Sequence, residues 1–134
     1  MTNIENDLIK RDLCYRLPYN VKVHAKYNDL GETIEIDGIV KMIDADGVVG
    51  IEVIDDFSSA WTYVHIDNVK PYLFPVDSMT DEQKEEWKSL VIQEAFGKSD
   101  GTLTVQDFYN MNYIDCRGLI PKGLAKDATN LNVY

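Results

Sequence analysis

The chain has 134 residues, of which 45% are hydrophobic, and this size is typical of one compact domain. Its 13 basic and 23 acidic side chains give a net charge of −10, which argues against a conventional nucleic-acid-binding protein because most of the surface repels a polyanion. Two cysteines (Cys14 and Cys116), no export signal and no apolar run of about 18 residues predict a cytoplasmic protein without a membrane span.

The first expected element is an amphipathic helix over residues 4–15, the entry helix, which we place within residues 1–19. Asn3 can cap this helix, and Pro18 prevents it from continuing. Because its polar face mixes both signs of charge, we expect it to cover the strands that follow and not a membrane surface. Its apolar side chains recur at helical spacing: Ile4, Leu8, Ile9 and Leu13.

Residues 20–73 alternate apolar and polar side chains with a period of two, which is typical of β-strands. Residues 44–47 predict a tight hairpin, Gly38 a bulge or sharp bend, and residues 67–71 a single 3₁₀ turn. Four or five short antiparallel strands predict a small, strongly bent β-barrel over residues 20–75. We expect an SH3-like form, with an OB-like barrel or a simple curled sheet as alternatives. One face of the second strand is expected to carry Ile34, Ile36, Val40 and Met42.

After the strands the hydrophobic period changes to three and four, which predicts helices. Thr80 and Gln83 have the spacing of a capping box at the start of a long helix that stops at Gly97. Thr104 can cap a second, short helix, and Asp115 can cap a last turn. Two or three helices should therefore pack against the barrel.

These elements predict a single α+β domain over residues 1–134. Its parts are the entry helix (1–19), an SH3-like barrel (20–75) and a helical part (76–134). We expect the tail from Asp127 to be loosely held.

Residues 96–107 lie between two predicted helices and resemble a degenerate EF-hand loop. Phe96 and Lys98 occupy the first and third ligand positions, where a calcium ion needs oxygen atoms. We therefore expect an ordinary turn, with Asp107 as the acid that follows the Thr104 cap, and we predict no metal and no cofactor.

Cys116 lies beside Arg117, and a cation next to a cysteine favours the reactive thiolate. A cysteine enzyme also needs a base, and the two histidines, His24 and His65, lie on predicted strands with no spacing relation to Cys116. Asp115 and Arg117 are better explained as a cap and its ion-pair partner. A small enzyme that uses Cys116 is therefore a second alternative, and we expect no catalytic residues.

The polar loop before the fourth expected strand contains Phe57, and Trp61 follows closely. Aromatic side chains provide a large contact area at low entropic cost, so we expect Asp55, Asp56, Phe57 and Trp61 to form a partner-binding surface. The sequence thus predicts a non-enzymatic accessory protein that binds another protein by its loops or sheet edge, with no direct nucleic-acid or membrane contact. The first alternative is an acidic mimic of nucleic acid that inhibits a host nuclease or defence factor.

Several sequence motifs are spread along most of the chain. They are Asp12-Leu13-Cys14, Arg16-Leu17-Pro18-Tyr19, Val21-Lys22, Val69 to Pro75, Ser78-Met79-Thr80, Glu82-Gln83, Tyr113, Asp115, Arg117 to Ile120 and Lys122 to Ala125. These motifs resemble those of small uncharacterised proteins common in Bacteroides and in phages and mobile elements of that group. Pro121 departs from the family pattern, which has an acidic helix former there. The resemblance implies a mobile-element setting and the host cytoplasm, and it implies no activity and no site residue.

Overall fold

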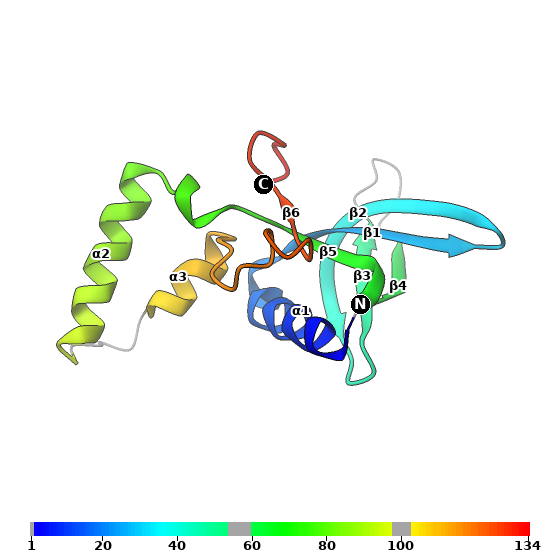
Figure 1. Cartoon of the computed structure of the whole chain (residues 1–134), viewed down its shortest axis with the longest axis horizontal. Helices are drawn as coiled ribbons and strands as arrows, with labels where there is room; N and C mark the ends of the chain where they lie inside the picture. Colours follow the sequence, from blue (N-terminus) through cyan, green and yellow to red (C-terminus); the bar gives the residue numbers. More distant parts are fainter. Residues whose placement is uncertain (1, 54–59, 98–102) are drawn as a thin grey trace.

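The structure is a computed structural model that describes residues 2–53, 60–97 and 103–134. It has an α+β fold with an N-terminal helix, α1 (Asn3–Arg16), an open six-stranded sheet, and two later helices (Figure 1). These are α2 (Asp81–Ala95) and α3 (Val105–Met111), which form an arm to one side of the sheet (Figure 1). None of the helices that the structure describes has the length and apolar character needed to cross a membrane.

The sheet has the strand order β4-β3-β2-β1-β5-β6, in which all neighbours are antiparallel except the parallel pair β5 and β6. The expected closed barrel is therefore wrong. β5 pairs with β1 and not with β4, and a sixth strand from the C-terminal segment takes the outer side of β5. The strands are β1 (Lys22–Asp29), β2 (Glu32–Ile43), β3 (Val48–Val53), β4 (Trp61–His65), β5 (Val69–Leu73) and β6 (Lys126–Asp127).

The expected hairpin between β2 and β3 is confirmed. The carboxylate of Asp44 accepts hydrogen bonds from the backbone N–H groups of Asp46 and Val48, both at 2.9 Å. Gly47 has a φ of +86°, which a residue without a Cβ adopts at little cost. The expected 3₁₀ turn before the fifth strand is also present, one residue earlier than predicted, at Ile66–Asn68.

The irregularity in β2 lies between Val40 and Met42 and not at Gly38. A Cβ at Gly38 would lie 2.4 Å from Ile51 Cγ2, so this glycine serves a close approach between neighbouring strands. The bulge reverses the alternation, so Met42 lies against Gly50, away from the face that Val40 buries. The expectation that Met42 shares a face with Val40 is therefore wrong, and Ile43 packs against the core instead.

The main hydrophobic core lies between α1, one face of the sheet and residues 119–125. The alternation in β1 explains the sheet's contribution, because Val23 and Ala25 are fully buried while His24 and Lys26 point to the other face. The buried residues of this core are Ile9, Leu13, Val21, Val23, Ala25, Val40, Val49, Ile51, Val64, Ile66, Val69, Leu73, Leu119, Leu124 and Ala125.

Two charged residues of α1, Asp12 and Arg16, are completely buried. The Arg16 guanidinium donates to the Asp12 carboxylate at 2.9 Å and to the backbone carbonyls of Tyr109 and Ile114 at 3.1 and 2.6 Å. Arg117 donates to the other Asp12 oxygen at 2.6 Å. These bonds connect α1 to segments about a hundred residues away in the sequence. The N-cap of α1 is Thr2 and not the expected Asn3.

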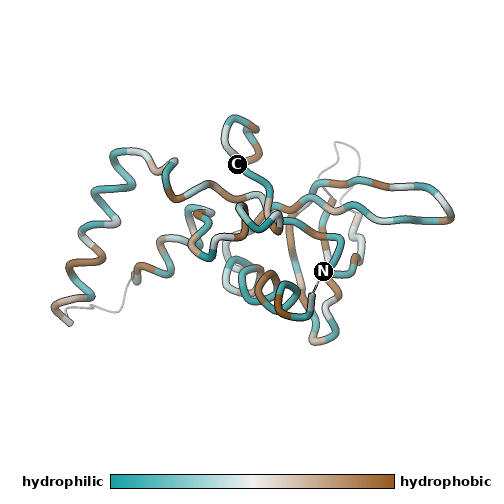
Figure 2. The backbone as a smooth tube through the Cα atoms, in the orientation of Figure 1, coloured by the Kyte–Doolittle hydropathy of each residue, from teal (hydrophilic) through white to brown (hydrophobic). Residues whose placement is uncertain are grey.

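The arm of α2 and α3 has its own small core, built on Leu90, Phe108 and Ile114. Trp87 Nε1 donates to the Tyr109 hydroxyl at 2.8 Å and joins the two helices. Figure 2 shows hydrophilic residues along most of α2, and Leu90 is the only residue of this helix that is buried.

The C-terminal segment is held against the sheet, contrary to the expectation of a loose tail. The ring of Tyr134 stacks on that of Tyr113 with 3.7 Å between centroids. Its hydroxyl donates to the Tyr72 carbonyl and accepts from the Lys22 N–H, both at 2.9 Å. Burial raises the pKa of the Tyr134 phenol above its usual value.

Candidate functional site

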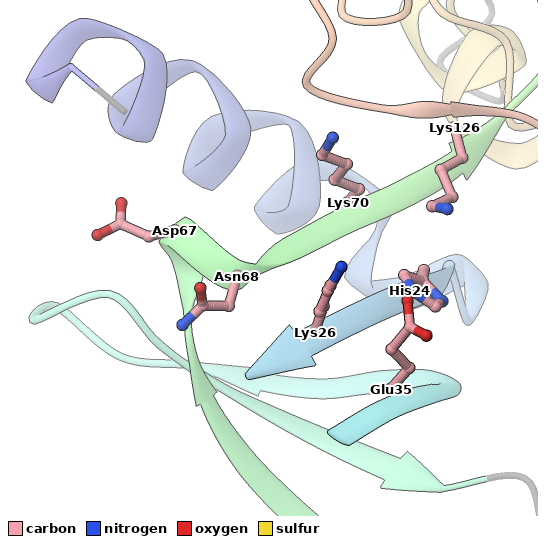
Figure 3. A pocket seen from close by; sticks show the side chains of 7 residues that line it. All are labelled: His24, Lys26, Glu35, Asp67, Asn68, Lys70 and Lys126. Carbon is pink, nitrogen blue, oxygen red and sulfur yellow. Dashed lines mark hydrogen bonds and ion pairs between the residues drawn. The ribbon is translucent and has the colours of Figure 1, made fainter. Parts of the chain in front are cut away.

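A groove of about 340 Å³ crosses the polar face of the sheet, over β1, β2, β5, β6 and the turn between β4 and β5 (Figure 3). The strand register assembles it. His24 on β1 lies opposite Lys70 on β5, and Lys26 lies opposite Glu35 on β2. Because these residues alternate with buried ones, their side chains leave the sheet on the side away from the main core. The lining residues are His24, Lys26, Glu35, Asp67, Asn68, Lys70 and Lys126.

Three lysines from three different strands surround this groove: Lys26, Lys70 and Lys126 (Figure 3). Within the described parts of the chain, none of their ammonium groups has an ion-pair or hydrogen-bond partner. Four of the six lysines described elsewhere do have a partner. The lysines with an acidic or carbonyl partner are Lys10, Lys22, Lys41 and Lys88.

The two acids that line the groove are each engaged by a histidine. Glu35 Oε1 lies 3.3 Å from His24 Nε2, and Asp67 Oδ2 lies 3.2 Å from His65 Nδ1. Each of these carboxylates therefore has a histidine within ion-pair distance, and neither forms an ion pair with a groove lysine in the described parts of the chain.

His24 is the centre of a polar cluster at the floor of the groove. Its Nδ1 lies 2.9 Å from Asp37 Oδ1, so the ring faces one carboxylate on each side. A neutral imidazole can donate to one of them, whereas the imidazolium can donate to both. The Tyr72 hydroxyl donates to the same Asp37 oxygen at 2.6 Å. Burial, followed by this hydrogen bond, raises the pKa of the Tyr72 phenol, so it remains a donor.

Sequence reasoning missed this groove because it followed the apolar members of the alternation in β1. The polar members of the same strand, Lys22, His24 and Lys26, are spaced by two and share a face. Basic side chains at every second position of a strand predict that one of its faces is basic. The contributions of Lys70 and Lys126 depend on which strands become neighbours, and the local pattern does not carry that information.

Of the four expected partner-binding residues, the structure describes only Trp61. Asp55, Asp56 and Phe57 lie outside the described residues. Trp61 begins β4 and has a side chain that is 47% exposed, and Tyr63, which the sequence analysis did not single out, is 60% exposed on the same face of the strand. Two adjacent aromatic rings are therefore presented on β4.

β4 is also an edge strand of the sheet. Val53 N–H donates to the Ala60 carbonyl at 2.9 Å, and Ile66 N–H donates to the Gly47 carbonyl at 2.8 Å. In an antiparallel ladder hydrogen-bonded pairs alternate, so the backbone groups of Trp61 point away from β3 toward the open side. The same holds for Tyr63. An edge with exposed aromatic rings and outward backbone groups can accept another strand.

Cys116 has a different environment from that expected of a catalytic cysteine. Its sulfur lies 3.4 Å from Arg117 Nη1 and 3.6 Å from Gln106 Nε2, and neither histidine is among its hydrogen-bond partners in the described chain. Asp115 caps the following turn, as expected, through the N–H groups of Leu119 and Ile120. Arg117 pairs with the buried Asp12 and not with Asp115, which corrects the expected ion pair.

In the residues that the structure describes, no three His, Cys, Asp or Glu side chains come together as a metal site. The Thr104 and Asp107 side chains form the expected capping box at α3, at the end of the EF-hand-like segment. No protein-family model, curated protein or solved structure matches the chain.

Proposed function

We propose that this protein is a non-enzymatic accessory module that binds a partner protein at the open edge of β4. The occupant is an extended segment of the partner, which adds as a strand beside β4. One observation carries the proposal: Trp61 and Tyr63 present exposed rings on the strand whose outward backbone groups have no partner among the described residues.

Backbone and side chains have separate roles in this mode of recognition. The outward N–H and C=O groups of β4 give affinity to any extended chain, whereas the two rings select apolar side chains at every second position of the partner. Aromatic residues also contribute much of the binding energy at protein interfaces. Asp55, Asp56 and Phe57 belong to this proposal as sequence neighbours of the edge.

The charge of the chain favours a basic partner segment. The net charge is −10, and Glu52 lies directly opposite Trp61 in the ladder. Because the Glu52 side chain leaves the sheet on the same face as the rings, a segment with both apolar and basic side chains on that face contacts the rings and lies near this carboxylate.

The test uses tagged protein and affinity capture from host cells, followed by mass spectrometry. The double variant Trp61→Ser and Tyr63→Ser should lose the partner that the wild type captures, while Ile4→Ser, which removes a side chain that is 81% exposed on α1, should retain it. All three substituted side chains are exposed, so thermal unfolding should change little in either variant.

A second pair of variants separates the contribution of the β4 backbone to partner binding from that of the side chain. Tyr63→Ser removes only the ring, whereas Tyr63→Pro also removes the outward N–H without touching the ladder to β3. We expect the proline variant to bind the identified partner at least tenfold more weakly than the serine variant. Equal binding by the two variants, or capture of the same partner by the double variant, contradicts strand addition at β4.

The acidic mimic is the second proposed function, and the first two turns of α2 favour it. Asp81, Glu82, Glu85 and Glu86 are all exposed there, on a helix that lies away from the sheet (Figure 1). In the capture experiment this function predicts a nuclease or other nucleic-acid-binding partner. Such a partner is lost when these acids become amides and in high salt, and it is retained by the β4 variants.

The fold relationship, the cellular setting and the enzyme alternative also belong to the proposal. Five consecutive antiparallel-paired strands with a 3₁₀ turn before the last support an SH3-like relationship. The motif resemblance supports a mobile-element protein of the host cytoplasm. An enzyme that uses Cys116 receives less support, because in the described chain the thiol is contacted by arginine and amide donors and by no base.

A further inference from the structure

We propose that the lysine groove binds the phosphate group of a small molecule, at a site separate from the β4 edge. The observation that motivates this is the gathering of Lys26, Lys70 and Lys126 around one groove in a chain that carries a net charge of −10. Nine lysines are described, five of them have no partner within the described chain, and three of those five share this groove.

Like charges that gather without a direct ion-pair partner repel one another. Glu35 is engaged by His24, and Asp67 by His65, so the nearest carboxylates are directed to the imidazoles. A bound dianion relieves this repulsion because it contacts several ammonium groups at once.

The chemistry of the lining suits a phosphate oxygen. Each ammonium group is a compact charge with three donors, which is the form in which lysine binds phosphate. Asn68 adds an amide that can donate to a further oxygen, and His24 at the floor adds an imidazole held in place by Asp37.

The size of the groove favours a small molecule over a protein segment. Its volume of about 340 Å³ lies near the lower end of the range of small-molecule sites, roughly 300 to 1,000 Å³. The lysines also stand on paired strands of one sheet, so their backbone positions are set before a ligand arrives.

The test titrates the full chain with adenosine 5′-monophosphate, with inorganic phosphate and with adenosine, and follows backbone amide shifts by NMR. We expect saturable shifts at the amides of Lys26, Lys70 and Lys126 with the nucleotide and none with adenosine. Inorganic phosphate distinguishes the source: equal affinity identifies the free ion as sufficient, and weaker affinity identifies a phosphorylated molecule. Both results support a phosphate site.

Matched charge variants locate the site. Lys70→Gln should weaken binding at least tenfold, whereas Lys84→Gln, which removes an equally unpartnered lysine from α2, should leave the affinity within twofold. The triple glutamine variant at 26, 70 and 126 should show no saturable binding. Should that variant not fold, the single variants and the comparison with adenosine decide alone.

Three outcomes overturn the proposal. They are the absence of saturable binding by either phosphate probe, equal weakening by Lys84→Gln and Lys70→Gln, and binding of a glutamate-rich peptide in the groove without binding of phosphate. None of these outcomes tests strand addition at β4, which has its own variants and its own readout. The double serine variant of β4 should bind phosphate like the wild type.

Discussion

The sheet with α1 and the arm of α2 and α3 are stabilised to very different degrees. In the described chain the main core contains 15 buried apolar residues, whereas the core of the arm contains three. Burial of apolar surface is the dominant favourable contribution to folding, so the sheet region resists local unfolding far better than the arm. The groove and the β4 edge both belong to the stable region.

This difference assigns distinct roles to the two regions. Recognition surfaces on paired strands are fixed in position before a partner arrives, which lowers the entropic cost of binding. The arm is joined to the rest through few contacts, and the clearest of these is Arg16, whose guanidinium reaches the carbonyls of Tyr109 and Ile114. Substitutions in each region test whether this comparison is correct.

The largest effect is expected from Arg16→Met. It removes two hydrogen bonds to the arm and leaves the buried Asp12 with Arg117 alone, so the free energy of unfolding should fall by about 3–5 kcal/mol. Urea denaturation followed by circular dichroism measures this loss. Arg11→Met, on the exposed side of the same helix, is the matched control and should change stability by less than about 0.5 kcal/mol.

A loss below about 1 kcal/mol for Arg16→Met would mean that hydrophobic packing replaces the ion pair, as it does in some buried networks. The connection between the two regions would then depend on apolar contacts and not on the guanidinium.

The next effect separates the two cores directly. Ile51→Ala empties a fully buried position of the main core and should cost about 3–4 kcal/mol, whereas Leu90→Ala, at a position that is 7% exposed, should cost about 2 kcal/mol. Hydrogen exchange should show faster exchange throughout α2 in the Leu90 variant while the strands keep their protection. Faster exchange of the strands in that variant would show that the two regions unfold as one unit.

The smallest effect is a loss of stability at alkaline pH that concerns the sheet and the C-terminal segment. Burial raises the pKa of Tyr72, Tyr113 and Tyr134 above 10.0 in the folded state. Stability from a raised pKa is complete below the unfolded-state pKa near 10 and is lost as the pH rises through the folded-state value. Urea midpoints should therefore fall above about pH 10.

Tyr72→Phe provides the control for this prediction. The variant lacks one late-titrating phenol, so its urea midpoint should fall less between pH 9 and pH 11 than that of the wild type. Absorbance at 295 nm should also show one fewer tyrosine that ionises only on unfolding. An unchanged alkaline profile in this variant contradicts the assigned role of the Tyr72 hydroxyl.

Features that depend on neighbouring residues in the chain could be predicted from the sequence. The capping boxes at Thr80 and Thr104 are confirmed, as is the Asp44 hairpin, because each needs only side chains within four positions. Helix and strand assignments followed from the hydrophobic period for the same reason.

Features that depend on distant parts of the chain could not be predicted. Asp12 and Arg117 are 105 positions apart, and a buried pair at that separation leaves no local pattern. The number of expected strands had predicted a barrel. In the structure β6 pairs in parallel with β5, and the sheet is open. The lysine groove has the same origin, because its lysines come from three strands, β1, β5 and β6, that are neighbours in the sheet although they lie far apart in the sequence.

The buried position of Arg16 constrains how this chain folds during its synthesis. The ribosome makes α1 first, yet the carbonyls and the second arginine that complete its charge network are made about a hundred residues later. A nascent chain that docked α1 early would enclose the Asp12–Arg16 pair without the carbonyls and the Arg117 guanidinium that complete its hydrogen bonds. We therefore expect the final docking of α1 to follow synthesis of the C-terminal segment, and a chain arrested before Arg117 to be incompletely folded.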